Sequence, residues 1–223
     1  MNVTEPDEAG PASHMRGDAT ARPSRRGLQT RARLVAAGRR VFEREGYQGT
    51  RVSDVSAEAG VSHGTFYTYF TSKLDILRAV IESVVEEMEN ASAMSGPKGG
   101  SALDRIEFGN RMFFDVYRRN SRLMEIFEEV SSTEPEFRAM RRRIRLMWVR
   151  RTERSIRSMQ EAGVADRSLD PSCAASALGS MADNFAYVWL VLGEPFDEEL
   201  AVNTISRLWA QAIGLAVPED RFV

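Results

Sequence analysis

The stretch that decides the fold of this chain is TRVSDVSAEAGVSHGTFYTYFTSK, at residues 50–73. In its first half, Val52 and Val55 are spaced as on one face of a short helix. Gly60 ends that helix, because glycine readily takes the left-handed backbone of a tight turn. Ser62 then begins a second short helix, since its side-chain oxygen can accept a hydrogen bond from an amide of the first turn. The stretch predicts two helices joined by a tight turn, as in a helix-turn-helix motif.

The second helix of this motif carries small, polar and aromatic side chains from His63 to Tyr69. A helix fits the major groove of B-DNA, which is about 12 Å wide, and its N-terminal residues come nearest to the base edges. Gly64 would allow the backbone to approach the DNA closely. A tight helical hairpin with no DNA-binding role would have the same shape, so the shape alone leaves both interpretations open.

Apolar residues recur with the helical period on both sides of the motif. Before it, Leu34, Val41 and Phe42 predict a helix over residues 28–45, with Gly46 as its C-terminal stop. Further helices are predicted over residues 73–94, 101–119, 121–131, 135–162, 171–193 and 197–215. No window shows the alternation of a β-strand, so the chain is predicted to be all-α.

Two segments are predicted to lie outside the helices. Residues 1–26 are rich in Pro, Gly, Ala, Ser and Arg and have few large apolar side chains, which predicts a flexible basic N-terminal arm. Arg22, Arg25 and Arg26 of this arm are either solvated linker residues or contacts to DNA phosphate or to the minor groove. Residues 95–100 contain three glycines and a proline and no apolar residue, so they must interrupt the helix.

Charge is distributed unevenly along the chain. The 223 residues include 30 Lys and Arg against 32 Asp and Glu, a net charge of -2, which argues against a protein that coats nucleic acid without sequence preference. Residues 16–51 hold ten Arg against three acidic residues, so a basic N-terminal part precedes an acidic remainder. Nine Arg between residues 138 and 157 predict a solvated helix face. The alternative is that Arg143, Arg150 or Arg154 binds an anionic ligand.

The sequence contains no motif of an enzyme. It lacks a phosphate-binding P-loop, a dinucleotide-binding glycine fingerprint and a nucleophile elbow. His14 and His63 are the only histidines and Cys173 is the only cysteine, so neither a metal site nor a disulfide within the chain is expected. The apolar runs are far shorter than the roughly 20 residues of a membrane span. We therefore expect a cytoplasmic protein with no catalytic residues, no cofactor and no membrane partner.

Residues 28–88 carry a pattern that resembles the signature of the TetR family of bacterial transcriptional regulators. The residues that carry the resemblance are Thr30, Arg31, Ala37, Phe42, Gly46, Tyr47, Thr50, Val52, Asp54, Val55, Ala59, Gly60, Val61, Ser62, Gly64, Thr65, Tyr67, Phe70, Ser72 and Lys73. The chain departs from the pattern at Ser56, Phe66, Tyr69 and Leu74, where the family usually has Ala, Leu, His and Glu. Because Tyr69 changes the flank of the recognition surface, the resemblance implies no particular operator sequence.

The resemblance implies two domains after the arm. Residues 27–73 would form a three-helix DNA-binding domain, with the helix-turn-helix at 51–70, and residues 74–223 a helical ligand-binding and dimerisation domain. The residues implied to contact DNA are Thr50, Arg51, Ser62, His63, Gly64, Thr65, Tyr67, Thr68, Tyr69 and Lys73. Thr50, Arg51 and Lys73 would hold phosphates, and the others would face the groove or its flank.

The stretch 103–148 is dense in aromatic residues and methionine. Most of these side chains should form core, but such residues also line adaptable pockets. The resemblance places a ligand cavity among these helices and the one around Met181. The candidate pocket residues are Phe108, Met112, Phe113, Tyr117, Phe127, Met147, Trp148, Met181, Asn184 and Phe185.

The last two predicted helices combine small and large apolar residues on more than one face, which a single small domain cannot bury. The resemblance likewise implies a four-helix bundle built from these helices in two copies of the chain. The candidate interface residues are Leu178, Trp189, Leu208, Trp209 and Ile213. Two-fold symmetry would set the two recognition helices about 34–36 Å apart, one turn of DNA, which predicts a palindromic operator.

These features together lead to one functional hypothesis and one alternative. The hypothesis is a sequence-specific, homodimeric repressor that binds double-stranded DNA and is released by a small hydrophobic or amphipathic ligand. The alternative is a ligand-independent DNA-binding protein, or an activator, of the same fold. The effector, the operator, the regulated genes and the sign of regulation stay open at this level.

Overall fold

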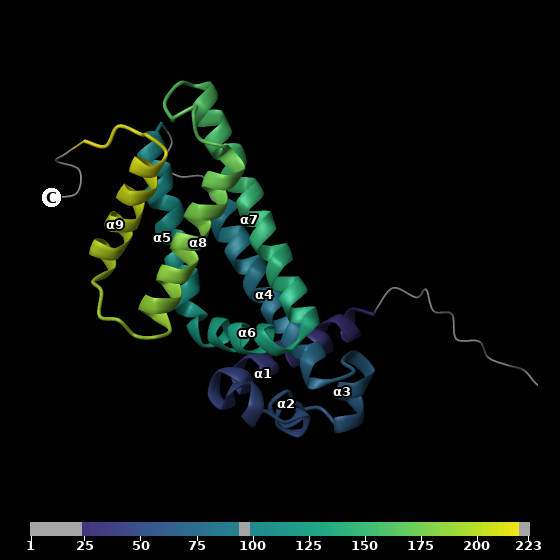
Figure 1. The fold of residues 1–223 in the computed structure, drawn as a ribbon. Helices are drawn as coiled ribbons and strands as arrows, with labels where there is room; N and C mark the ends of the chain where they lie inside the picture. Colours follow the sequence, from purple (N-terminus) through teal and green to yellow (C-terminus); the bar gives the residue numbers. More distant parts are fainter. Residues whose placement is uncertain (1–23, 94–98, 219–223) are drawn as a thin grey trace, which may run out of the picture.

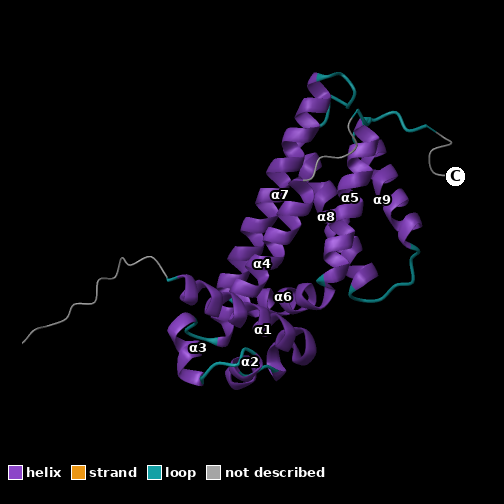
Figure 2. Cartoon of the chain, turned by 180° about the vertical axis from the view of Figure 1, so that it is seen from behind, coloured by secondary structure: helices purple, strands orange, loops and turns teal. Residues whose placement is uncertain are grey.

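The computed structural model describes residues 24–93 and 99–218, and helices make up all regular secondary structure of these residues (Figure 2). In chain order they are α1 (Arg25–Gly49), α2 (Val52–Glu58), α3 (His63–Tyr69), α4 (Lys73–Ala93), α5 (Ala102–Arg119), α6 (Ser121–Thr133), α7 (Pro135–Glu161), α8 (Pro171–Leu190) and α9 (Glu198–Ala212). The predicted all-α fold is confirmed, with a helix at each predicted position. Within this part of the chain, no helix combines the length and apolarity needed to cross a membrane.

α1 begins at Arg25, earlier than predicted. The side chain of Ser24 caps the helix by accepting a hydrogen bond from the amide of Gly27, at 3.1 Å. Arg25 and Arg26 therefore belong to a helix, and the prediction that the flexible arm extends to residue 26 is wrong for them. The rest of the predicted arm, residues 1–23, lies outside the described residues. Gly46, with φ 70° and ψ 178°, ends the regular part of α1 as predicted.

Two helices in the C-terminal half end earlier than predicted. α8 ends at Leu190 rather than at residue 193, and α9 ends at Ala212 rather than at residue 215. Gly193 and Gly214 have φ values of 80° and 75°, so each completes a left-handed turn that closes the helix before it. The helical run is also interrupted between α4 and α5 as predicted, although residues 94–98 lie outside the described part of the chain.

The helices gather at two ends of the molecule (Figure 1). α1, α2 and α3 lie at one end, and α5, α7, α8 and α9 extend away from them. α6 lies crosswise between the two groups and contacts α1 and α7, while α4 packs against both α1 and α5. Of the last two helices, α8 packs mainly on α7 and α9 on α5. α4 and α6 therefore connect the helix-turn-helix to the larger helical part.

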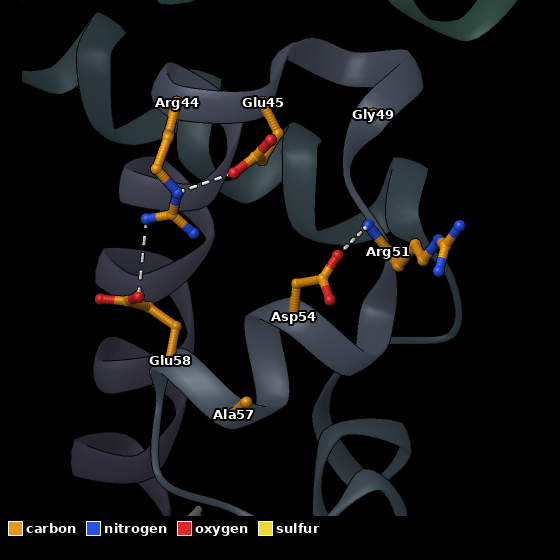
Figure 3. A pocket seen from close by; sticks show the side chains of 7 residues that line it. All are labelled: Arg44, Glu45, Gly49, Arg51, Asp54, Ala57 and Glu58. Carbon is orange, nitrogen blue, oxygen red and sulfur yellow. Dashed lines mark hydrogen bonds and ion pairs between the residues drawn. The ribbon is translucent and has the colours of Figure 1, made fainter.

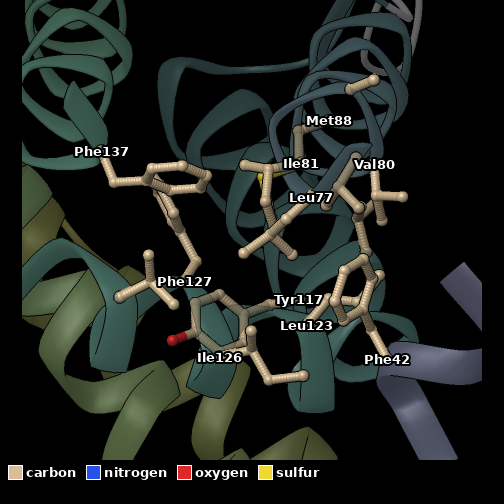
Figure 4. Close-up of a cluster of buried hydrophobic side chains, with 14 of the residues drawn as sticks. Phe42, Leu77, Val80, Ile81, Met88, Tyr117, Leu123, Ile126, Phe127 and Phe137 are labelled. Atoms are coloured by element: carbon tan, nitrogen blue, oxygen red, sulfur yellow. The ribbon is translucent and has the colours of Figure 1, made fainter. Parts of the chain in front are cut away.

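One buried apolar cluster, the main core, runs from α1–α3 into the adjoining part of the larger helical group (Figure 4), and a second cluster fills the far end around Ile156 and Ile213. The main core extends from Phe42 of α1 through Leu77 and Ile81 of α4 to Leu123 of α6 and Phe137 of α7, all at most 1% exposed. Burying a side chain of this size contributes roughly 1.5–3 kcal/mol. Because α1 shares this core with α4, α6 and α7, α1–α3 and the adjoining part of the larger helical group form one packed unit.

A buried polar contact, which we call the joint, ties α1 to α4 and to the corner between α5 and α6. Asn120 is 1% exposed, and its side-chain oxygen accepts a hydrogen bond from the Arg39 guanidinium at 2.6 Å. Its amide nitrogen donates to the Glu87 carboxylate at 3.3 Å and to the Val116 carbonyl at 2.8 Å. Arg119 adds an ion pair to Glu87 at 3.1 Å. Buried polar groups need such partners, so the joint holds α1 in one orientation relative to α5 and α6.

Candidate nucleic-acid interface

The turn between α2 and α3 has the geometry that its residues predict. Gly60 has a φ of 63°, in the left-handed region, and the amide of Val61 donates to the Ser56 carbonyl at 3.0 Å. Val61 packs against the main core. The Ser62 hydroxyl accepts a hydrogen bond from the Thr65 amide at 3.1 Å and so caps α3. The predicted helix-turn-helix is confirmed.

α3 has a buried face and an exposed face. Phe66 and Phe70 are 0% and 2% exposed, with ring centres 5.8 Å apart, and they anchor the helix on the core. The remaining residues of the segment are fully or partly exposed, and we call them the α3 surface: Ser62, His63, Gly64, Thr65, Tyr67, Thr68 and Tyr69. Seven of the ten residues predicted to contact DNA therefore share one accessible surface.

The polar atoms of the α3 surface bond only locally. The hydroxyls of Ser62 and Thr65 are 2.8 Å apart, and Thr68 donates to a carbonyl one turn earlier in the same helix, at 3.3 Å. The His63 ring meets the edge of the Tyr67 ring at 5.1 Å between centres. Within the described residues, no side chain of the α3 surface forms a hydrogen bond to another helix. Their hydrogen-bonding capacity thus remains available to a partner.

Arg51 lies on the edge of an open hollow of about 580 Å³ between the end of α1 and α2 (Figure 3). Other charged residues of the hollow pair with each other, Arg44 with Glu45 at 2.8 Å and with Glu58 at 3.7 Å. The Arg51 side chain points away from them, and its backbone amide donates to Asp54 at 3.1 Å. A shallow, charged hollow is unlike the apolar cavities that bind small molecules. Arg51 stays a candidate phosphate contact.

Two predicted phosphate contacts bond to the end of α1. Thr50 is 2% exposed, and its hydroxyl donates to the Gly46 carbonyl at 2.6 Å. The Lys73 ammonium donates to the Tyr47 carbonyl at 2.7 Å and lies 4.3 Å from the centre of that ring, where burial lowers the pKa of Lys73. Both side chains therefore hold the kink at the end of α1. Thr50 is too deeply buried to meet a phosphate, whereas Lys73 is partly exposed and stays a candidate phosphate contact.

Part of the basic charge near the motif positions the motif itself. The Arg33 guanidinium donates to the Ala59 carbonyl at 2.6 Å, which fastens the end of α2 to α1. Arg40 bonds to Glu58 at 2.7 Å, and this hydrogen bond lowers the pKa of the Glu58 carboxyl. Arg33 and Arg40 bond within the protein, whereas Arg25 and Arg26 are exposed in the first turn of α1. The sequence alone does not tell which arginines play which role.

Two family models match the chain. The model of bacterial regulatory proteins of the tetR family matches residues 34–80, which contain the helix-turn-helix, and the model of the C-terminal domain of the transcriptional regulator EthR matches residues 107–214. The chain belongs to the TetR family of transcriptional regulators. Its DNA-binding domain is therefore the one that contains the α3 surface.

Similar proteins align with most of this TetR-family chain. The HTH-type transcriptional regulator EthR of Mycolicibacterium smegmatis is 26% identical over 205 residues, 91% of this chain and 94% of that protein. A bacterial regulatory protein in the tetR family from Rhodococcus RHA1 has a TM-score of 0.68 at 22% identity, covering 85% of this chain and 99% of its own. A protein from Saccharomonospora viridis, solved in complex with choline, has a TM-score of 0.72 at 18% identity, covering 85% of this chain and 100% of its own. The two structures share the fold.

The departures from the TetR-family pattern fit the packing of this chain. Ser56 is 4% exposed, and its hydroxyl donates to the Val52 carbonyl at 2.9 Å, so it buries no unbonded donor. Phe66 is fully buried, and Tyr69 and Leu74 are partly buried against the main core. The departures therefore leave the geometry of the motif intact and alter the surface at Tyr69.

The predicted ligand-pocket residues of this TetR-family chain divide between core and surface. Phe127 is 4% exposed and packs against Phe137, while Asn184 is exposed on α8. Tyr117 is 1% exposed, in the main core. The other predicted residues are partly buried: Phe108, Met112, Phe113, Met147, Trp148, Met181 and Phe185.

Two aromatic residues outside that prediction join the same region. Phe114 is 1% exposed, and its ring centre lies 5.9 Å from that of Phe185 and 5.5 Å from that of Trp189. A second hollow, of about 430 Å³, lies between α1 and α4 rather than among these aromatic residues. Arg143, Arg150 and Arg154 are exposed on α7, as a solvated face predicts.

Three of the five predicted dimer contacts are buried within the single chain. Leu178, Trp189 and Ile213 are 5%, 7% and 0% exposed, so the single chain leaves little of these side chains for a second copy to contact. The reason is that these positions lie on the inner faces of α8 and α9, toward α7 and α5. Leu208 is 47% exposed and Trp209 is partly exposed, so α9 still offers both to a partner.

Proposed function

We propose that this TetR-family chain is a homodimeric repressor that binds a palindromic DNA operator and is released by a small hydrophobic or amphipathic ligand. The α3 surface carries the DNA-binding part of the proposal, because its polar atoms are exposed, bond only within α3 and are held from behind by Phe66 and Phe70. Such a helix presents its side chains to base edges in the major groove. Arg25, Arg26 and Arg51 add exposed charges that attract phosphates.

The dimer part rests on exposed apolar side chains at and before α9. Leu192, Phe196, Leu200 and Leu208 are 64%, 40%, 60% and 47% exposed, and they come from the α8–α9 connection and from α9, at the outer edge of the molecule (Figure 1). Large exposed apolar side chains that gather in one region favour association with a partner. A two-fold dimer with its α3 helices about 34–36 Å apart would read two half-sites one DNA turn apart.

A charge placed in this region tests the dimer. Leu208→Glu should convert a dimer to a monomer in light scattering after size-exclusion chromatography, because an interface cannot bury an unpaired carboxylate cheaply. Leu28→Glu is the matched control, since Leu28 is 54% exposed in α1, far along the chain from α9. A monomer mass for the unchanged protein, or a dimer mass for Leu208→Glu, would contradict this part of the proposal.

Ligand control requires two conformations that the ligand binds with different affinity. Phe113 lies on α5, the helix that ends next to Asn120, and Asn120 is bonded to Arg39 of α1. A ligand that moves α5 or α8 would shift the joint and, with it, the helix that carries the motif. The choline complex of the Saccharomonospora viridis protein supports the view that a protein of this fold can hold a small molecule.

The experiment titrates the full chain, by fluorescence anisotropy at near-physiological salt, against the DNA upstream of its own gene, with random duplex as competitor. A sequence reader should keep its complex, since specific binding typically exceeds non-specific binding by a factor of about 1,000 or more. The variant His63→Ala/Thr68→Ala should lose this preference and keep only weaker, salt-sensitive binding. Equal displacement by both duplexes would refute a specific regulator.

Three further measurements test the finer parts of the proposal. Five base pairs inserted between the half-sites should abolish tight binding, because they turn one half-site by about half a helical turn relative to the other. Operator affinity that stays unchanged at saturation with every compound that binds would favour the ligand-independent protein. A rise in transcription in vitro on adding the protein would favour the activator.

A further inference from the structure

The hollow between α1 and α4, which we call the α1–α4 groove, has a mainly small and apolar lining. Its volume is about 430 Å³. Ala32, Val35 and Ala36 of α1 and Ala79 of α4 supply the apolar part of the lining. Because alanine has the smallest apolar side chain, a partner can approach the backbone of both helices closely here. The groove therefore fits a narrow partner with small side chains.

Two carboxylates on the α4 side of the groove have no cation beside them. Glu82 and Glu86 line the groove, are exposed and lie one helical turn apart. Within residues 24–93 and 99–218, neither forms an ion pair or a hydrogen bond. Like charges at this spacing repel each other. A cation brought to the groove would therefore stabilise α4.

The two arginines that line the groove contact other groups. Arg39 donates to Glu43 at 3.0 Å and to Asn120 of the joint at 2.6 Å. The guanidinium of Arg31 lies over the ring of Phe70, 5.2 Å from its centre, in a cation–π contact. The groove thus presents an apolar lining and two unpaired anions, which favours a partner with cationic and small apolar side chains.

The chain itself supplies a segment of this chemistry. Residues 16–23, which lie outside the described part of the chain, have the sequence RGDATARP. Arg16 and Arg22 lie near the two ends of the segment, with Asp18 as its one acidic residue. The other side chains are small or, in proline, compact. The segment therefore matches the groove in both charge and side-chain size.

The segment is also long enough to follow the groove. It leads into Ser24, which caps α1, and the α1 side of the groove runs from Arg31 to Arg39. At a rise of 1.5 Å per residue, these two positions lie about 10 and 22 Å along the helix from Ser24. Eight extended residues span up to about 26–29 Å. A segment that turns back at Ser24 can therefore reach all of the groove.

We propose that the α1–α4 groove binds residues 16–23 of the same chain. The two arginines of the segment pair with the two carboxylates of α4, and its alanines pack on the apolar lining. A guanidinium that is paired with a carboxylate no longer attracts phosphate, so the docked segment is withheld from DNA. The docking goes beyond the proposed function and rests on it only for this effect on DNA binding.

Disulfide trapping in the full chain tests the docking. In a Cys173→Ser background, Ala19→Cys places one thiol in the segment and Ala36→Cys places the other in the groove. Mild oxidation should link the two within one chain, which mass spectrometry of the digested protein detects. Ala19→Cys with Ala57→Cys is the matched control, because Ala57 is also exposed and lies on α2, another neighbour of α1. The control pair should link at least about fivefold more slowly.

Charge exchange shows whether the ion pairs hold the segment. Glu82→Lys/Glu86→Lys should slow the link in the groove at least about fivefold, because attraction is replaced by repulsion. Adding Arg16→Glu/Arg22→Glu to this variant should restore the rate, since the same pairs form again with opposite signs. Circular dichroism checks that each variant keeps its helices.

A second pair of charge changes serves as the control for this effect. Glu161→Lys/Glu194→Lys makes the same change at exposed positions outside the groove and should leave the rate unaltered. The docking is overturned by equal rates for the groove pair and the Ala57 pair, by an unchanged rate in the variant with both groove carboxylates replaced, or by a link that joins two chains.

The docking and the proposed function fail in distinguishable ways. Operator affinity is measured for the linked protein before and after reduction. About tenfold weaker binding while linked supports both, because two cationic side chains are then kept from phosphates. Equal affinity in the two states leaves the docking in place and refutes its control of DNA binding. If no link forms in the groove while the operator is still read specifically, the docking is overturned and the DNA-binding function is unaffected.

Discussion

The α3 surface and the joint use polar side chains in opposite ways. On the α3 surface, the hydroxyls of Ser62, Thr65 and Thr68 are accessible and bond only within their own helix. In the joint, Asn120 is 1% exposed and bonds to the side chains of two other helices. Unused hydrogen-bonding capacity at a surface can serve recognition, whereas capacity used in the interior fixes the relative position of helices. Substitutions in the two regions should therefore affect different properties.

Asn120→Ala should have the largest effect. It leaves the Arg39 guanidinium and the Glu87 carboxylate without their buried partner, so we expect a loss of about 2–3 kcal/mol in the free energy of unfolding, measured by urea denaturation. Operator affinity should fall as well, because the joint orients α1. Gln211→Ala, exposed on α9, is the control. A loss below about 0.5 kcal/mol would show that the joint does not hold the helices together.

Thr68→Ala should show the opposite behaviour. We expect operator affinity to fall by about 1–2 kcal/mol, because an exposed polar contact to DNA is lost, and the free energy of unfolding to change by less than about 0.5 kcal/mol. Anisotropy and urea denaturation measure the two quantities on the same samples. Ser155→Ala, exposed on α7, should change neither. A loss of stability as large as the loss of affinity would remove the distinction between the two regions.

Ser62→Ala should affect both properties moderately, since Ser62 caps α3 and also belongs to the α3 surface. Loss of an N-cap costs about 1 kcal/mol of unfolding free energy. Ser62→Asp should restore the cap, and hence the thermal midpoint, but should bind DNA worse than the alanine variant because its charge repels phosphates. Recovery of operator affinity in Ser62→Asp would show that Ser62 acts on DNA binding only through the stability of α3.

Tyr117→Phe should have the smallest effect on stability. Tyr117 is 1% exposed, and its ring packs against Phe113 with ring centres 5.7 Å apart, so phenylalanine keeps the packing. Because the ring contacts stay, loss of the hydroxyl should change the free energy of unfolding by less than about 1 kcal/mol, measured by urea denaturation. A decrease of more than about 1 kcal/mol would mean that the hydroxyl has a stabilising partner in the folded protein.

The helix-turn-helix could be predicted from the sequence because its geometry depends on residues that are close together in the chain. The left-handed turn at Gly60 and the cap at Ser62 each involve groups within five residues of one another. The roles of Thr50 and Lys73 could not be transferred by position alone. Their acceptors are the carbonyls of Gly46 and Tyr47, which become available only because α1 kinks there.

Side-chain direction in the long helices was not predictable from the sequence. Apolar residues occupy several faces of α8 and α9, so the helical period does not tell which face packs on α7 and α5 and which face is exposed to solvent. In the structure, Leu178 and Ile213 are buried and Leu208 is exposed. The joint could not be predicted from the sequence either, because Arg39 and Asn120 are 81 positions apart. Contacts of that separation depend on tertiary packing, which no local pattern encodes.

The continuity of the main core has a consequence for chimeric regulators. Phe42 of α1 is covered by side chains of α4 and α6, so a segment that ended at Lys73 would lose the cover of its own apolar face. A transplanted DNA-binding segment should instead run from Arg25 to Ala93 and include all of α4. The recipient must also supply an α6 with matching apolar side chains at the position of Leu123. Exchange of binding specificity between relatives is therefore limited by the fit of this shared interior.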